Sequence, residues 1–148
     1  MTGQTIAVIG AGLMGHGIAL TMARAGHRVR VTDPVPEALS AVSGRIAESL
    51  ELMGEPAERI PDVLKNVAAC GSLREAVSDC FAIFEAAPEK MDLKQRIFAD
   101  IESLAPRDCL LASNTSVMPI TEIMGQLDRR DRALGTHWWN PPHMIPLV

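Results

Sequence analysis

Apolar and polar residues alternate along the chain with two different periods, which predict short strands and longer helices in turn. Short apolar runs bounded by glycine, proline or polar residues predict six strands, at Thr5–Ile9, Arg28–Thr32, Val67–Ala69, Phe81–Ala87, Cys109–Ala112 and Ala133–Trp139. Apolar residues at helical spacing predict the intervening helices, at Gly12–Ala25, Glu37–Leu52, Pro61–Lys65, Met91–Leu104 and Ile120–Leu127. Strands that alternate with helices favour a parallel sheet in an α/β fold.

The arrangement of these elements indicates a doubly wound domain. Residues 81–87 form a nearly unbroken apolar run, as expected of a strand that is buried on both faces of a parallel sheet. Two halves of three strands each predict a Rossmann-type, mostly parallel six-stranded sheet with helices on both faces. In such sheets ligands bind beyond the carboxyl ends of the strands, so the residues that follow each strand are the candidates for function.

Composition and charge narrow the possible partners. The 148 residues match the usual size of one domain, and a net charge of −4 leaves no basic stripe for nucleic acid or an anionic membrane. The apolar stretch from Ile6 to Leu20 is interrupted by glycines and follows no basic residue, so we expect neither a signal peptide nor a membrane segment. Three widely spaced cysteines, Cys70, Cys80 and Cys109, suit neither a disulfide framework nor a zinc site. We therefore expect reduced, buried thiols in a cytoplasmic protein that holds no metal.

A glycine motif follows the first predicted strand and opens the next helix. Gly10-Ala11-Gly12-Leu13-Met14-Gly15 has the G-x-G-x-x-G spacing of dinucleotide-binding sites. The first glycine of such a motif makes a tight turn, the second leaves room for a pyrophosphate, and the third packs the helix against the strand. The amides that open the helix then face the phosphates. We expect the phosphate-binding part of a cofactor site to contain Gly10, Gly12, Leu13, Met14 and Gly15.

An acidic residue at the end of the second predicted strand adds specificity to this motif. Asp33 lies eighteen residues beyond Gly15, where a carboxylate can accept hydrogen bonds from a ribose. A carboxylate also repels the 2′-phosphate of NADP, so the pattern favours NAD. The alternative is a glycine turn without a ligand, followed by an aspartate that caps a strand end. Arg28 and Arg30 are expected to be solvated or paired, and His16 to be a surface or packing residue.

Four segments of the sequence carry a family resemblance. They are Ile6–Gly17 (IAVIGAGLMGHG), Phe84–Phe98 (FEAAPEKMDLKQRIF), Ala112–Ser116 (ASNTS) and Gly135–Val148 (GTHWWNPPHMIPLV). Together they resemble the NAD-binding domain of L-3-hydroxyacyl-CoA dehydrogenases over the whole chain. Many Rossmann enzymes share the first segment, whereas A-S-N-T-S followed by G-x-H-aromatic-aromatic-N-P is far more selective. The resemblance implies an NAD-dependent oxidoreductase of fatty acid metabolism.

The resemblance also implies roles for single residues. His137 matches the base that takes the proton of the substrate's 3-hydroxyl, and Ser116 the hydroxyl that hydrogen-bonds the substrate oxygen. Asn140 matches an asparagine that supports the active site. The remaining cofactor-side positions are Ala86, Ala87, Glu89, Lys94 and Asn114, of which Asn114 and Glu89 match contacts near the nicotinamide and Lys94 the substrate side of the cleft. Without the resemblance, a lone histidine in a tryptophan-rich strand is a packing residue, and a Ser-Asn-Thr-Ser strand end is a capping loop.

Three departures from the family pattern leave the substrate open. Trp138-Trp139 stands where the fatty acid enzymes have two phenylalanines, and Pro142-His143 where they have Val-Pro. The stretch from Glu37 to Val67 is shorter than the helical arm that helps to cover CoA. Relatives with such variants oxidise L-gulonate or carnitine, and the lambda-crystallins are related as well. The alternatives are therefore a gulonate or carnitine type of dehydrogenase, or a non-catalytic NAD-binding protein.

The family pattern continues past the segment that resembles Ile145–Val148. There it runs into a glutamate that orients the catalytic histidine, and then into a helical domain that carries most of the dimer interface. We therefore expect residues 1–148 to form an NAD-binding Rossmann domain, with a helical C-terminal substrate and dimerisation domain absent from this chain. Such a chain is expected to bind NAD without turning over its small-molecule substrate, and the longer protein to be a homodimer.

Overall fold

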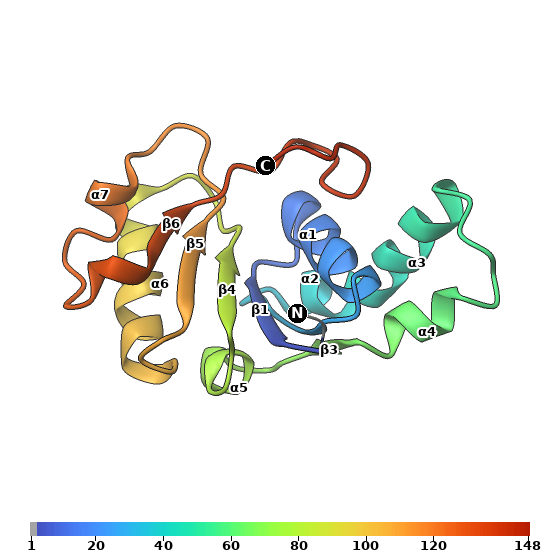
Figure 1. Ribbon diagram of the computed structural model, residues 1–148, viewed down its shortest axis with the longest axis horizontal. Coiled ribbons are helices and arrows are strands. Elements are labelled where there is room, and N and C mark those ends of the chain that lie inside the picture. Colours follow the sequence, from blue (N-terminus) through green and yellow to red (C-terminus); the bar gives the residue numbers. More distant parts are fainter. Residues whose placement is uncertain (1–2) are drawn as a thin grey trace.

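A six-stranded sheet forms the centre of the protein, which a computed structural model describes from residue 3 to residue 148 (Figure 1). Its strands are β1 (Thr5–Ile9), β2 (Arg28–Thr32), β3 (Val67–Ala69), β4 (Ala82–Glu85), β5 (Leu110–Ser113) and β6 (Ala133–Gly135). They lie in the order β3-β2-β1-β4-β5-β6, and every neighbouring pair is parallel. The predicted doubly wound Rossmann sheet is confirmed. Because Ile9 pairs with Glu85 in the register, the loops that follow β1 and β4 leave the sheet side by side.

Helices cover both faces of this sheet. They are α1 (Leu13–Arg24), α2 (Pro36–Ser40), α3 (Val42–Leu52), α4 (Ile60–Leu64), α5 (Leu73–Val77), α6 (Met91–Leu104) and α7 (Ile120–Ile123), with a single 3₁₀ turn at Arg130–Arg132. Successive residues of β1 point to opposite faces, so Val8 packs with α1 and α3 while Ala7 and Ile9 pack with α5, α6 and α7. Two separate apolar cores result, one on each side of the sheet.

The structure differs from the predicted elements in four places, and the first is the predicted helix Ile120–Leu127, which ends at Ile123 in α7. The predicted helix Glu37–Leu52 is interrupted at Ala41, which separates α2 from α3. The predicted strand Ala133–Trp139 ends at Gly135 because its neighbour β5 ends at Ser113 in the same register, and the Trp138 amide donates to a side chain instead. Helix α5 was not predicted, although Ser72 caps its start: the Ser72 hydroxyl accepts from the Glu75 amide, and the Glu75 carboxylate accepts from the Gly71 amide.

The three cysteines are free and buried, as predicted. Burial raises the pKa of the Cys80 and Cys109 thiols to about 12. Arg30 donates to Asp79 and to the carbonyl of Glu75, so it is paired, as expected. Among residues 3–148, no group of three or more metal-ligating side chains gathers, and no helix is long and apolar enough to cross a membrane.

Candidate functional site

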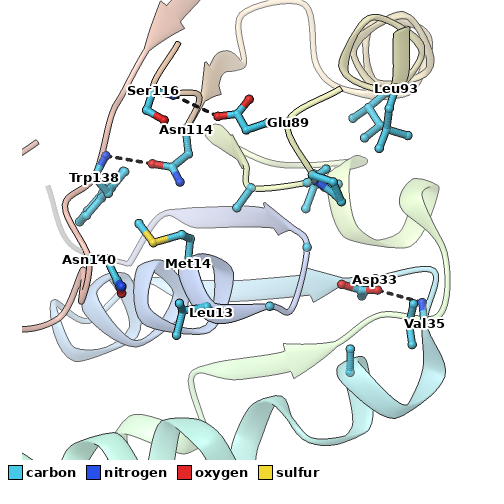
Figure 2. A pocket seen from close by; sticks show the side chains of 18 of the residues that line it. Leu13, Met14, Asp33, Val35, Glu89, Leu93, Asn114, Ser116, Trp138 and Asn140 are labelled. Atoms are coloured by element: carbon cyan, nitrogen blue, oxygen red, sulfur yellow. Dashed lines mark hydrogen bonds between the residues drawn. The ribbon is translucent and has the colours of Figure 1, made fainter. Parts of the chain in front are cut away.

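A cavity of about 760 Å³ lies at the carboxyl ends of the strands. The site residues predicted from the sequence, except Gly15 and Lys94, all line it: Gly10, Gly12, Leu13, Met14, Asp33, Ala86, Ala87, Glu89, Asn114, Ser116, His137 and Asn140. In Figure 2 the cavity extends from Asp33 and Val35 at one end to Asn114, Ser116 and Asn140 at the other. One continuous cavity therefore contains both the predicted cofactor-binding residues and the predicted catalytic residues.

Each of the three glycines of the motif is required at its position for a different structural reason. Gly10 has φ +106°, and a Cβ there would lie 2.8 Å from the Ala86 carbonyl oxygen. A Cβ at Gly15 would lie 1.8 Å from the Gly10 carbonyl oxygen, so this glycine permits close packing of α1 on the loop. A Cβ at Gly12 would meet nothing within 4 Å. Gly12 faces open cavity where a phosphate group can approach the backbone, so the loop fits a dinucleotide.

Helix α1 begins at this loop and presents unpaired amides to the cavity. Its first intrahelical hydrogen bond runs from the His16 amide to the Gly12 carbonyl, so the amides that precede His16 have no partner within the helix. These amides and the positive end of the helix dipole make an anion site. His16 itself is buried, with Nδ1 3.0 Å from the Gly12 carbonyl oxygen, and is a packing residue.

Asp33 holds the loop in place from the end of β2. Its Oδ2 accepts from the Ala11 amide at 2.7 Å and its Oδ1 from the Val35 amide at 2.8 Å. Arg45, which the sequence did not indicate, donates to the Ala11 carbonyl at 3.1 Å from helix α3. A carboxylate oxygen has a second lone pair, so Asp33 can still accept a hydroxyl proton of a ribose.

An apolar slot adjoins Asp33 and was not predicted. Val35 and Ala38 line the cavity, as do Leu93 and Ile97 of α6, and in Figure 2 Val35 and Leu93 lie at the Asp33 end. The i, i+4 spacing of Leu93 and Ile97 places both on one face of α6, which is the signal that could have identified them. Because the slot is apolar and lies beside a carboxylate that can accept from a ribose, it suits the adenosine end of the cofactor.

The opposite end of the cavity carries polar side chains from three loops. Asn114 accepts from the Trp138 amide at 2.9 Å, and Glu89 accepts from the Ser116 amide at 3.1 Å (Figure 2). His137 is exposed and stacks on Trp139, with ring centroids 5.9 Å apart. This end therefore brings an imidazole, a hydroxyl, an amide and a carboxylate to one cavity wall.

Lys94 lies outside the cavity, in contrast to its predicted role on the substrate side of the cleft. Its side chain is 1% exposed and its Nζ lies 2.7 Å from Glu85 Oε1, because the first turn of α6 points this residue beneath the end of β4. Glu85 and Ser113, which bond to each other at 2.6 Å, form the rest of this buried polar group. Gly15 is also outside the cavity, as its packing role requires.

Comparison with known proteins agrees with the geometry. Residues 5–148 match the model of the family described as 3-hydroxyacyl-CoA dehydrogenase, NAD binding domain. A probable 3-hydroxybutyryl-CoA dehydrogenase of Bacillus subtilis is 37% identical over 98% of this chain and 52% of its own length. An L-carnitine dehydrogenase of Nocardiopsis dassonvillei is 34% identical over 98% of this chain and 44% of its own. The crystal structure of FadB2 from Mycobacterium tuberculosis superposes with a TM-score of 0.92 at 36% identity, over 100% of this chain and 53% of that one.

The chain matches only part of each of these relatives. The chain spans about half the length of these relatives, and 20% of a glyoxysomal multifunctional protein of Brassica napus. The matched residues, 5–148, include the glycine loop, the acid after β2 and the polar end of the cavity. The chain therefore belongs to the 3-hydroxyacyl-CoA dehydrogenase family, of which it forms the NAD-binding domain.

Proposed function

We propose that this chain supplies the cofactor half of an enzyme that oxidises the 3-hydroxyl of a 3-hydroxyacyl-CoA or a related 3-hydroxy acid. The observation that carries the proposal is the position of His137 and Ser116, which line the same cavity as the glycine loop and Asp33. A site that only bound NAD would need neither a base nor a hydroxyl at its far end. Bound NAD⁺ supplies a hydride acceptor for the carbon that bears the hydroxyl.

The residues of the polar end have distinct proposed tasks. His137 takes the hydroxyl proton as the C–H bond breaks, a task that suits an imidazole because it exchanges protons near neutral pH. Ser116 hydrogen-bonds the substrate oxygen, and Trp139 holds the ring of His137 by stacking. Asn140 lies three residues beyond His137 and lines the same wall. The substrate leaves as a ketone, since it has lost a hydride and a proton.

We also propose that a second, helical domain completes the site in the active protein. Large apolar side chains are exposed beside the cavity, with Leu13 64% and Trp139 51% exposed. The chain covers 52% and 44% of the length of two relatives, so each is about twice as long as this chain, which leaves room for such a domain. A domain that closes over the substrate positions it and excludes water, effects that can contribute about 7–11 kcal/mol to lowering a barrier.

The decisive assay follows NADH absorbance during reduction of acetoacetyl-CoA. The chain would be tested alone and fused to the C-terminal half of the Bacillus subtilis relative, with NAD binding measured for both. We expect at most trace turnover by the chain alone and measurable turnover by the fusion. In the fusion, His137→Gln is expected to lower kcat by about 10²–10⁴-fold with little change in NAD affinity. His27→Gln, the same change before β2, is the matched control and should leave kcat unchanged.

The other outcomes discriminate between the alternatives. Strong turnover by the chain alone would contradict the need for a second domain. A fusion that oxidises L-carnitine or L-gulonate in preference to 3-hydroxybutyryl-CoA would assign a different substrate class to the same site. Normal NAD binding without turnover on any of the three substrates would favour a binding protein.

A further inference from the structure

The C-terminal segment, residues 136–148, passes over helix α1 and supplies part of the cavity wall (Figure 1). It contains no helix or strand, although His137 and Asn140 reach the cavity from it. Beyond Trp138 its backbone hydrogen bonds join its own residues, such as the Met144 amide with the Pro141 carbonyl at 3.0 Å. Packing, rather than hydrogen bonds to other elements, therefore fixes this part of the segment on the domain.

The segment packs against the domain at two points. At the first, the Trp138 side chain is 8% exposed and meets the ring of Phe84 edge to face, with centroids 5.9 Å apart. At the second, Pro142 is buried against Gly17 of α1. The two residues that reach the cavity lie directly before the first point and between the two. Their positions therefore depend on both contacts.

Gly17 leaves no room for a side chain at the second point. A Cβ there would lie 2.9 Å from Pro142 Cδ and 3.0 Å from His143 Nδ1, whereas nonbonded carbon atoms pack best at about 3.5–4.0 Å. Alanine is a better helix former than glycine, so α1 itself gains nothing from glycine at this position. The close approach of Pro142 therefore explains this glycine.

The helix that carries this contact also begins at the glycine loop. Gly17 follows Leu13, the first residue of α1, by four residues and so lies about one turn from the amides that open the helix. Because hydrogen bonds hold that turn rigid, the Gly17–Pro142 contact sets the distance between the anion site and the C-terminal segment.

We propose that Gly17 is a positioning residue for the catalytic end of the cavity. It lets Pro142 lie directly on α1, which places His137 and Asn140 at a set distance from the glycine loop. Gly17 does not line the cavity, so it acts without touching cofactor or substrate. The contact follows from the fold alone, whereas its effect on turnover rests on the proposed function.

Tryptophan fluorescence of the chain tests the contact. Trp138 and Trp139 are its only tryptophans, and it has no tyrosine, so the emission reports on the C-terminal segment. In Gly17→Leu we expect emission at longer wavelength and stronger quenching by acrylamide, because the displaced segment exposes Trp138. Gly17→Ala should give a smaller shift in the same direction. Gly44→Leu in α3, where a Cβ meets nothing within 4 Å, is the matched control and should leave the emission unchanged.

Kinetics test the consequence for turnover, in the fusion with the C-terminal half of the Bacillus subtilis relative. Gly17→Leu should lower kcat by about tenfold to a hundredfold, since a misplacement of about 1 Å can cost that much, and should change KM for NADH by less than about twofold. Gly44→Leu should change neither. A loss in KM with unchanged kcat would assign Gly17 to the glycine loop, and normal kcat with shifted emission would show that the contact positions no reacting group; either result overturns the proposal.

The remaining outcomes keep the contact and the proposed function apart. Unchanged emission in folded Gly17→Leu overturns the proposal whatever the fusion does. If Gly17→Leu does not fold, Pro142→Ala removes the same contact from the other side, and acrylamide quenching no stronger than in the wild type overturns the proposal. A wild-type fusion without turnover would contradict the proposed function and with it the catalytic role of Gly17, while the fluorescence would still decide whether the contact holds the segment.

Discussion

The carboxylate of Asp33 accepts a hydrogen bond of 2.7 Å from the backbone amide of Ala11, which joins the end of β2 to the glycine loop after β1. The acid expected to bind a ribose is therefore also part of the scaffold of the phosphate loop. Arg45 holds the carbonyl of the same residue, Ala11, from α3. Both polar groups of Ala11 are thus used within the protein, which leaves Gly12 and the first amides of α1 to meet the phosphates.

Replacement of Asp33 is expected to weaken NAD binding and to reduce the difference in affinity between NAD and NADP. Asp33→Ala removes an acceptor for the ribose and a support of the loop. NAD binding should therefore lose about 1.5–3 kcal/mol of free energy, the usual range for hydrogen bonds to a charged group. Asp33→Asn keeps an acceptor for the Ala11 amide and removes only the charge. It should therefore lose less NAD affinity while admitting NADP. Calorimetry with both cofactors measures these differences, and equal or tighter NADP binding by the wild type would contradict the assignment.

The glycines of the loop are expected to respond differently to the same substitution. Gly12 has extended backbone, and a Cβ there meets nothing within 4 Å, so Gly12→Val should fold and melt near the wild-type temperature. It should not bind NAD, because the valine side chain takes the space of the pyrophosphate. Gly15→Val is the contrasting variant, since its Cβ would lie 1.8 Å from a carbonyl oxygen and should prevent folding. A Gly12→Val chain that still bound NAD would place the cofactor elsewhere.

Local periodicity was sufficient to predict most of the elements. The predicted bounds of Thr5–Ile9, Arg28–Thr32 and Met91–Leu104 agree with β1, β2 and α6, because a continuous β-rich run, an alternation and a helical period respectively mark them and each ends at a clear stop signal. The predicted strand Ala133–Trp139 was too long, because a strand continues only as far as its neighbour, and the end of β5 is not visible in the sequence of β6.

In the candidate site, too, local sequence patterns predicted some residues, whereas others depend on contacts between distant parts of the chain. Motif residues such as Gly12 and Asp33 could be predicted because their chemistry depends on local spacing along one strand, turn and helix. The placement of Lys94 could not be, since a lysine in the first turn of a helix is ordinarily exposed and only the tertiary fold brings Glu85 beneath it. Arg45 is a similar case, because its contact with Ala11 spans 34 residues and carries no motif.

The cysteines are expected to be unreactive in the folded protein. Burial raises the pKa of Cys80 and Cys109 to about 12 and also raises the pKa of Cys70, so almost no thiolate is present at pH 8. A disulfide reagent such as Ellman's should therefore react slowly with the native chain and rapidly with three thiols after unfolding in guanidinium. Val117→Cys places a thiol at a position that is 77% exposed and should react at once. Fast reaction of the native wild type would contradict the burial of these side chains.

The stability of the C-terminal segment is expected to depend on pH through His143. This histidine packs against Gly17 of α1 and lies 6.0 Å from the ring of His16, in the segment that passes over α1 (Figure 1). Burial, and then the neighbouring charge of His16, lower the pKa of His143 from its usual 6.5. Well above pH 6.5 the ring is neutral in the folded and the unfolded chain, so it adds no pH dependence there. As the pH falls below 6.5, the unfolded chain takes up a proton that the folded chain resists, and the free energy of unfolding decreases.

His143 can change the free energy of unfolding by at most about 1.4 kcal/mol per pH unit, because one proton is involved. Urea denaturation at intervals between pH 5 and pH 8 would measure the slope. His143→Gln, which cannot take up the proton, should flatten the decline below pH 6.5, while Met144→Gln at the exposed neighbouring position should leave it as in the wild type. The same segment carries His137 and Asn140 into the cavity, so NAD affinity should fall with the stability of the segment in the wild type and less in His143→Gln. Parallel slopes in wild type and His143→Gln would show that another group controls the acid response.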